Sequence, residues 1–347
     1  MATRAVADTT NRSGARSAGA ALPKRPKGGL RLRYLVPLTV LVVLGMVVAA
    51  SYPGYRTAMR DMRAEVLTGS RIVETAEGPI EYAEIGTGAP VLVVHGNGGG
   101  YDQGLLAGRM FIGEDFRLIA PSRFGYLHTP LPGDGSAAAQ ADAHAALLDA
   151  LDIDQVVVAA ISDGGPSALQ FALRHPDRIA GLIMVAAKSH TPPPDNAVQA
   201  LAFNTLFRSD YSYWVVTTLF ESQLLALLGM PSDVQAALAP EQIDAVTEYL
   251  RIMHPISMRS PGIYNDRDAL SALPSQTYPL ERITAPTLVI HGTLDSLQPF
   301  THAQHTAGHI PEARLVALEG GGHVPVDHLE RITTEMHSFL TDHTAVP

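Results

Sequence analysis

The sequence predicts an α/β fold in which a mostly parallel central sheet is covered by helices. Short apolar runs alternate with helical stretches after residue 68. Continuous apolar runs of this kind are typical of strands buried on both faces of a parallel sheet. The alternation stops between about 190 and 280, where the sequence has helical periodicity and no clear strand. This interruption predicts an α-helical cap inserted above the sheet.

The strands can be assigned in chain order. A length of 347 residues with 46% hydrophobic content allows one large core or two small ones. The segments SRIVET and IEYAEIGTG, separated by a turn, predict a two-stranded opening because β-branched residues alternate with polar ones. Further strands are predicted at residues 91–95, 116–120, 155–160, 181–186, 286–291 and 313–318.

The N-terminal 54 residues are not expected to contribute to this core. Residues 1–33 contain eight basic residues and one acid, Asp8, which predicts a disordered cytoplasmic tail. Residues 34–52 carry no charge, and this length is just enough to cross a hydrocarbon layer of about 30 Å as a transmembrane signal-anchor. The basic residues before the span predict that the following folded domain lies outside the cytoplasm, and whether the segment is cleaved stays open. Residues 53–67 are then expected to form a juxtamembrane helix, and residues 68–347 the folded domain.

Charge and cysteine content exclude several function classes. The chain carries −9 and its tail +7, so the remaining residues carry −16. A domain this acidic is not expected to bind nucleic acid. The sequence contains no cysteine, which excludes disulfides, thiolate metal sites and a cysteine nucleophile.

The pattern around Ser162 predicts a nucleophile elbow. A buried strand runs into Ser162, and an amphipathic helix follows. A sharp strand-to-helix turn needs small residues two before and two after the nucleophile, and these are Ala160 and Gly164. An attack by Asp163 would instead put the β-branched Ile161 at the first small position, so Ser162 is the predicted nucleophile. The alternative to a nucleophile elbow is a strand followed by a glycine-capped helix, in which Ser162 has no catalytic role.

A glycine-rich turn after the strand at 91–95 predicts an oxyanion hole. The sequence HGNGGG at this point lets backbone N–H groups face a ligand without obstruction by side chains. The expected donors are the N–H groups of Asn97 and Asp163, with Gly98 as the alternative to Asn97. The Asn97 amide is also a candidate for direct contact with substrate. A plain glycine-rich turn remains an alternative. A phosphate-binding loop is not favoured, because the sequence lacks the GK[ST] ending of that motif.

Two later residues complete a predicted catalytic triad. Asp295 lies four residues past one strand, and His323 lies in a loop after the last strand. A serine nucleophile needs a base, and the base needs an acid that holds its tautomer. The order Ser162, Asp295, His323 is the order expected for this arrangement.

These motifs resemble those of the α/β-hydrolase superfamily, in particular its esterase and lipase-like members, over residues 68–347. The resembling segments are HGNGGG, AISDGG, HGTLD and GGGH. The resemblance implies an oxyanion turn, an attacking serine, an orienting aspartate and a basic histidine at the positions already named. The chain departs from the family pattern at Ala160, where a glycine is usual, and at Ser122, where many relatives have aspartate.

The expected function is hydrolysis of carboxylic esters with small or lipid-like apolar acyl groups, without a cofactor. Gly98 and Trp214 are the expected substrate contacts. The aromatic residues of the cap, Trp214 among them, could instead only pack inside the cap. His302, His305 and His309 recur on one helical face, but no metal is expected there. The same triad also fits an amidase, a peptidase, a C–C bond hydrolase or a cofactor-free haloperoxidase. A non-catalytic ligand-binding protein of this fold is the alternative from another class.

Overall fold

The computed structural model describes most of the chain and divides it into two compact units, residues 1–53 and 54–347. Helix α1 (Gly29–Val66) belongs partly to each unit. Its stretch from Arg33 has a mean hydropathy of 2.3 and is long and apolar enough to cross a membrane. Most of the predicted basic tail lies outside the described residues, which are 29–191, 196–228, 230, 232–268 and 278–344.

The second part of α1, residues 54–66, packs within the larger unit. Arg63 forms an ion pair of 2.9 Å with Asp210. The Tyr101 hydroxyl donates to the carbonyl of Val66 at 2.9 Å. These contacts make residues 54–66 part of the compact unit that contains the sheet.

An eight-stranded sheet forms the centre of the larger unit, in the order β1-β2-β4-β3-β5-β6-β7-β8. The β1–β2 and β2–β4 pairs are antiparallel, and every other pair is parallel. The predicted mostly parallel sheet is therefore confirmed. The strands are β1 (Arg71–Thr75), β2 (Gly78–Ile85), β3 (Pro90–Val94), β4 (Arg117–Pro121), β5 (Val156–Ile161), β6 (Ile179–Val185), β7 (Thr287–Gly292) and β8 (Arg314–Leu318).

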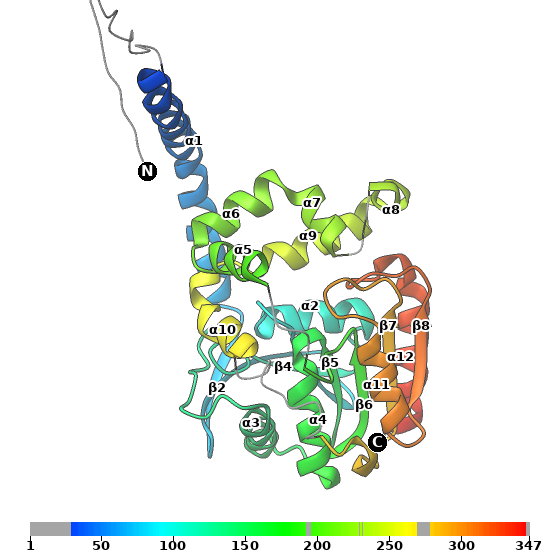
Figure 1. Cartoon of the computed structure of the whole chain (residues 1–347). Helices are drawn as coiled ribbons and strands as arrows, with labels where there is room; N and C mark the ends of the chain where they lie inside the picture. Colours follow the sequence, from blue (N-terminus) through cyan, green and yellow to red (C-terminus); the bar gives the residue numbers. More distant parts are fainter. Residues whose placement is uncertain (1–28, 192–195, 229, 231, 269–277, 345–347) are drawn as a thin grey trace, which may run out of the picture. The chain divides into compact units, whose positions relative to one another are not determined.

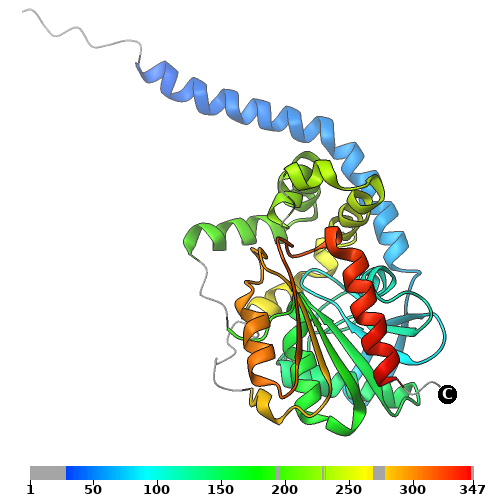
Figure 2. The same cartoon turned by 90° about the vertical axis from the view of Figure 1, so that its right-hand side faces the viewer.

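Helices cover both faces of this sheet, and each face has its own core. Apolar residues of α2 and α12 pack on one face, and those of α3, α4 and α11 pack on the other. Figure 2 shows α11 in orange and α12 in red on opposite sides of the sheet. The bounds are α2 (Tyr101–Phe111), α3 (Ala137–Ala150), α4 (Gly165–Arg174), α11 (Thr301–His309) and α12 (Leu329–His343).

Between β6 and β7 the chain forms a helical insertion instead of returning directly to the sheet. Figure 1 shows α5 to α9 gathered at one end of the sheet. The insertion has small apolar cores of its own, one of which reaches Val324 and Val326 near the C-terminus. Its helices are α5 (Ala197–Phe207), α6 (Asp210–Leu219), α7 (Glu221–Leu227), α8 (Ser232–Ala237), α9 (Pro240–Arg251) and α10 (Ser260–Asp268).

Candidate active site

Ser162 lies at the sharp turn between β5 and α4, at the start of a short 3₁₀ turn (Ser162–Gly164). Its backbone φ is +51°, in the left-handed region that non-glycine residues rarely adopt. A side chain at Gly164 would place its Cβ 2.6 Å from the Val94 carbonyl oxygen. Ala160 is completely buried in β5. The local geometry that the sequence predicts for an elbow is therefore present around Ser162.

Asp295, in the loop after β7, accepts a hydrogen bond from His323. The distance from His323 Nδ1 to Asp295 Oδ2 is 2.8 Å. The backbone N–H groups of Leu297 and Gln298 donate to the other carboxylate oxygen at 2.9 and 2.8 Å. Burial on its own raises the pKa of Asp295, but hydrogen bonds from His291 and His323 outweigh burial and hold this pKa well below its usual range. The carboxylate is thus ionised and fixes a His323 tautomer whose Nε2 is an acceptor.

Ser162 and His323 share the wall of one cavity of about 420 Å³. Asn97 and Asp163 line the same cavity. Among the hydrogen bonds of the described residues, none joins Ser162 Oγ to His323, so the structure brings the two residues together only as parts of one cavity wall. Most apolar residues of the wall come from the helical insertion, namely Phe203, Leu206, Phe207, Leu224, Leu228, Leu250 and Met253, and Leu297 is added from the loop after β7.

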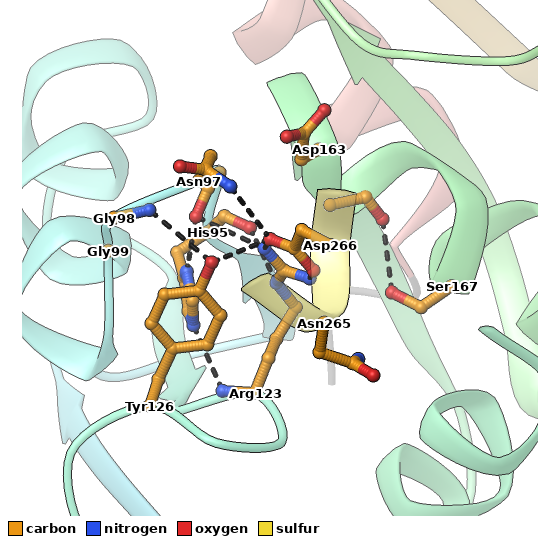
Figure 3. Close-up of polar contacts among 12 residues, drawn as sticks. His95, Asn97, Gly98, Gly99, Arg123, Tyr126, Asp163, Ser167, Asn265 and Asp266 are labelled. Atoms are coloured by element: carbon orange, nitrogen blue, oxygen red, sulfur yellow. Dashed lines mark hydrogen bonds and ion pairs between the residues drawn. The ribbon is translucent and has the colours of Figure 1, made fainter. Parts of the chain in front are cut away.

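The turn after β3 presents different N–H groups to different partners. The N–H of Gly98 donates to the Tyr126 hydroxyl at 3.4 Å, and Gly98 is not part of the cavity wall. The Asn97 side chain turns toward Asp266, with 3.4 Å between Asn97 Nδ2 and Asp266 Oδ2 (Figure 3). The backbone N–H of Gly98 is thus already paired, and of these two residues it is Asn97 that lines the cavity.

A buried ion pair holds this turn from behind. Arg123 donates to the carbonyls of His95 and Gly96 at 3.0 and 3.2 Å. Its guanidinium also makes two bonds to Asp266, of 2.7 and 2.6 Å, and the Tyr126 hydroxyl donates to the same carboxylate at 2.6 Å (Figure 3). Burial lowers the pKa of Arg123, but the Asp266 carboxylate outweighs this effect and raises it. Sequence reasoning missed Asp266, because it lies on α10 with no motif around it.

The Asp163 side chain has partners that the sequence analysis did not anticipate. Lys188 Nζ lies 2.6 Å from Asp163 Oδ1, and Gln298 Nε2 donates to the same oxygen at 3.0 Å. Burial on its own raises the pKa of Asp163, but the Lys188 ammonium outweighs burial and lowers this pKa. Asp163 therefore contributes a buried, paired carboxylate as well as its backbone N–H.

The departure at Ser122 also has a structural partner. The Ser122 hydroxyl donates to Glu81 Oε2 at 2.7 Å and accepts from the Tyr101 N–H at 3.0 Å. His128 Nδ1 lies 2.6 Å from the other oxygen of Glu81. A completely buried glutamate on β2 thus supplies a carboxylate next to Ser122.

Trp214 is not brought to the cavity. Its ring lies 5.8 Å from the Tyr55 ring and 6.3 Å from the Tyr211 ring, between centroids, and it is not part of the cavity wall. Among the predicted histidines, His302 is buried and its Nδ1 accepts from the Ser189 N–H at 3.2 Å. Within the described residues, no group of three or more His, Asp or Glu side chains is placed to hold a metal ion.

Comparisons with known proteins agree with this architecture. A family model described as alpha/beta hydrolase fold matches residues 89–327. The 2-hydroxymuconate semialdehyde hydrolase of Pseudomonas putida is 29% identical over 279 residues, which cover 75% of this chain and 90% of that protein. An alpha/beta hydrolase fold protein from Nakamurella multipartita is 29% identical, with a TM-score of 0.62 over 78% of this chain and 99% of that one. A thermophilic esterase from Thermogutta terrifontis is 25% identical, with a TM-score of 0.61 over 80% and 100% of the two chains. Because the family model spans well over half of the sequence, this chain belongs to the α/β hydrolase fold family.

Proposed function

We propose that the protein is a serine hydrolase that cleaves carboxylic esters through Ser162, His323 and Asp295. The observation that carries this proposal is the Asp295–His323 hydrogen bond beside a cavity that also contains Ser162 at positive φ. A buried carboxylate that orients a histidine next to a serine is the arrangement required for nucleophilic acyl transfer.

The proposed reaction follows the usual two half-reactions. His323 Nε2 removes the proton of Ser162 Oγ, which attacks the ester carbonyl, and the N–H groups of Asn97 and Asp163 stabilise the oxyanion. The tetrahedral intermediate then collapses, the alcohol leaves with the proton carried by His323, and an acyl-enzyme remains. Water, deprotonated by the same histidine, attacks the acyl-enzyme and releases the acid and Ser162.

The cavity wall supports apolar acyl groups as substrates. Phenylalanine, leucine and methionine side chains from the insertion provide most of the apolar residues in the wall of the cavity that contains Ser162. A cavity of this kind favours groups that leave water easily, because the free energy of transfer scales with buried apolar area. Similarity to an esterase of known structure also supports ester hydrolysis.

A second candidate is a hydrolase that acts on a substrate like that of the Pseudomonas putida relative, which is named 2-hydroxymuconate semialdehyde hydrolase. Its identity of 29% over most of both chains favours this candidate. The same serine, histidine and acid would act, and a semialdehyde substrate tested beside graded esters separates the two candidates.

We also infer that the apolar part of α1 anchors the enzyme in a membrane. The preceding tail is strongly basic, which favours a cytoplasmic N-terminus and a catalytic unit on the other side. A lipid-like ester substrate fits an enzyme that is anchored at a membrane. The negative charge of the catalytic unit does not favour binding of nucleic acid.

A fluorophosphonate probe tests the proposed mechanism, because it reacts covalently with activated serines. We expect rapid labelling of the full chain, mapped by peptide mass spectrometry to Ser162, and no labelling of Ser162→Ala. Ser222 is an exposed serine that bonds Gln235, so Ser222→Ala is a matched control that should label normally. A folded protein that resists the probe at Ser162 would favour a non-catalytic ligand-binding role.

A further inference from the structure

We propose that Lys188 is a positioning residue of the active site, which holds both residues of the elbow and neutralises Asp163 beside His323. The proposal rests on the proposed serine hydrolase mechanism, because it concerns the donor and the base of that mechanism. It assigns a task to a side chain that no motif in the sequence marks.

Lys188 holds the elbow through two separate groups. Its backbone N–H donates to the Ser162 carbonyl at 2.9 Å, and its ammonium lies 2.6 Å from the Asp163 carboxylate. Both charged side chains are buried, with relative exposures of 7% for Lys188 and 11% for Asp163. A Cβ at Gly165 would lie 2.2 Å from the Lys188 carbonyl oxygen, so this glycine allows the close approach.

Gln298 connects this pair to the other half of the site. Its side-chain amide donates to Asp163 Oδ1, while its backbone N–H donates to Asp295 Oδ1. The residue with the proposed oxyanion donor and the acid behind His323 are thus joined through one glutamine. A shift of Asp163 is therefore expected to disturb the oxyanion hole and the triad together.

The choice of lysine at this position is distinctive within the chain. Lys188 is the only lysine in the sequence after Lys27, and all the other basic Lys or Arg residues after Lys27 are arginines. A compact ammonium at the end of a flexible stem can reach a single carboxylate oxygen in a narrow space, whereas the planar guanidinium is larger and donates as a fork. The ion pair is not expected to add much stability, because burying two charges costs about as much free energy as their attraction returns.

The charge balance around His323 gives the pair a measurable consequence. Asp163 and His323 line the same cavity and interact electrostatically. Removing the ammonium leaves the buried Asp163 carboxylate without its main partner. An uncompensated negative charge stabilises the protonated imidazolium, so the base loses activity at a higher pH. Removing the carboxylate instead leaves the ammonium and gives the opposite shift. Other charged or titratable groups around His323 are Asp295, which it contacts, and His291, which contacts the same carboxylate. Tyr249 and Arg267 line the same cavity.

Four variants test this account in the full-length, detergent-solubilised enzyme, with a neutral p-nitrophenyl ester as substrate. The measurement is the acid limb of kcat/KM against pH. We expect Lys188→Met to move this limb up by about one pH unit and Asp163→Asn to move it down by a similar amount. The double variant should return close to wild type, and Lys188→Arg, if folded, should retain the wild-type limb because it keeps the charge.

The two single variants should also lower kcat more than they raise KM, because the elbow is less well held. Limbs that coincide in all folded variants, or that move in the same direction for both single variants, would overturn the role of Lys188. Thermal melts identify any variant that fails to fold, and the double variant leaves no unpaired charge at positions 163 and 188. Loss of the proposed function itself is a separate result, since wild-type activity would then survive Ser162→Ala.

Discussion

At the scale of single residues, the site depends on one strained backbone and several satisfied polar groups. Ser162 keeps a φ of +51° because its neighbours on β5 and α4 are packed around the turn. Such a conformation costs on the order of 1–3 kcal/mol and persists only where the surrounding structure holds it. Ser162 in this conformation lines the cavity that His323 also lines.

Asp295→Asn provides a residue-level prediction. An asparagine at this position keeps the shape but offers its amide to His323 Nδ1, which favours the wrong tautomer for a base. We expect kcat to fall about 10⁴-fold with little change in KM, measured with a soluble ester at pH 7. Asp154→Asn, at an exposed aspartate, is the control and should behave like wild type. A loss smaller than tenfold in Asp295→Asn would contradict the acid role.

His144 provides a prediction for pH-dependent stability. It is almost completely buried, and its Nε2 has no hydrogen-bond partner among the described residues. Burial, followed by the charge of Arg123, lowers the pKa of His144 from 6.5 to about 3. Between these values the unfolded chain binds a proton that the folded chain does not, so stability falls as pH decreases from about 6.5 toward 3.

His144→Leu removes this effect. We expect the variant to be at least as stable as wild type at pH 7, with a further gain relative to wild type of about 2 kcal/mol at pH 5. Thermal melts of the two full-length proteins at both pH values measure this difference. An equal gap in melting temperature at pH 7 and pH 5 would show that the histidine is protonated in the folded state.

At the scale of elements, substitutions at the two small residues of the elbow are expected to have different effects. Gly164→Ala places a Cβ against the Val94 and His95 carbonyl oxygens, so the turn must move and activity should fall at least about tenfold. Ala160→Gly restores the usual family residue in a strand without positive φ, and should cost only about 0.5–1 kcal/mol of stability. Ester hydrolysis and melting temperature of the two variants decide the point. Full activity in Gly164→Ala would contradict a rigid elbow.

The strands could be predicted because they are short, apolar and buried on both faces. β5 and β7 differ from the predicted ranges by a single residue at each end, and both are buried throughout. Their carboxyl ends determine where Ser162 and Asp295 lie, so those site residues could also be placed from sequence. Residues that depend on tertiary contacts between distant segments could not be placed.

Trp214, Asp266 and Lys188 illustrate this limit. The sequence assigns Trp214 to a helix but does not determine which face turns to the cavity, and the structure turns it toward Tyr55 and Tyr211. Asp266 pairs with Arg123, which lies far away in the sequence, and Lys188 pairs with Asp163 on another element. Local periodicity and short motifs do not predict which distant residues form such pairs.

At the scale of the whole molecule, the proposed anchor predicts a defined topology. Alkaline phosphatase fused to the C-terminus, which is active only outside the cytoplasm, should be active in a bacterial host, and the fusion should resist extraction by alkaline carbonate. Replacing the basic residues of the tail by glutamate should reduce this activity, because the charge bias sets orientation. A cytoplasmic reporter that is active at the same C-terminus would contradict the proposed orientation.

The most direct measurement of the central claim is the rate of p-nitrophenyl butyrate hydrolysis by wild type, Ser162→Ala and Ser222→Ala. If Ser162 is the nucleophile, Ser162→Ala loses about 10⁴-fold or more in kcat, while Ser222→Ala keeps the wild-type rate. A folded Ser162→Ala protein that hydrolyses the ester at the wild-type rate would contradict the account.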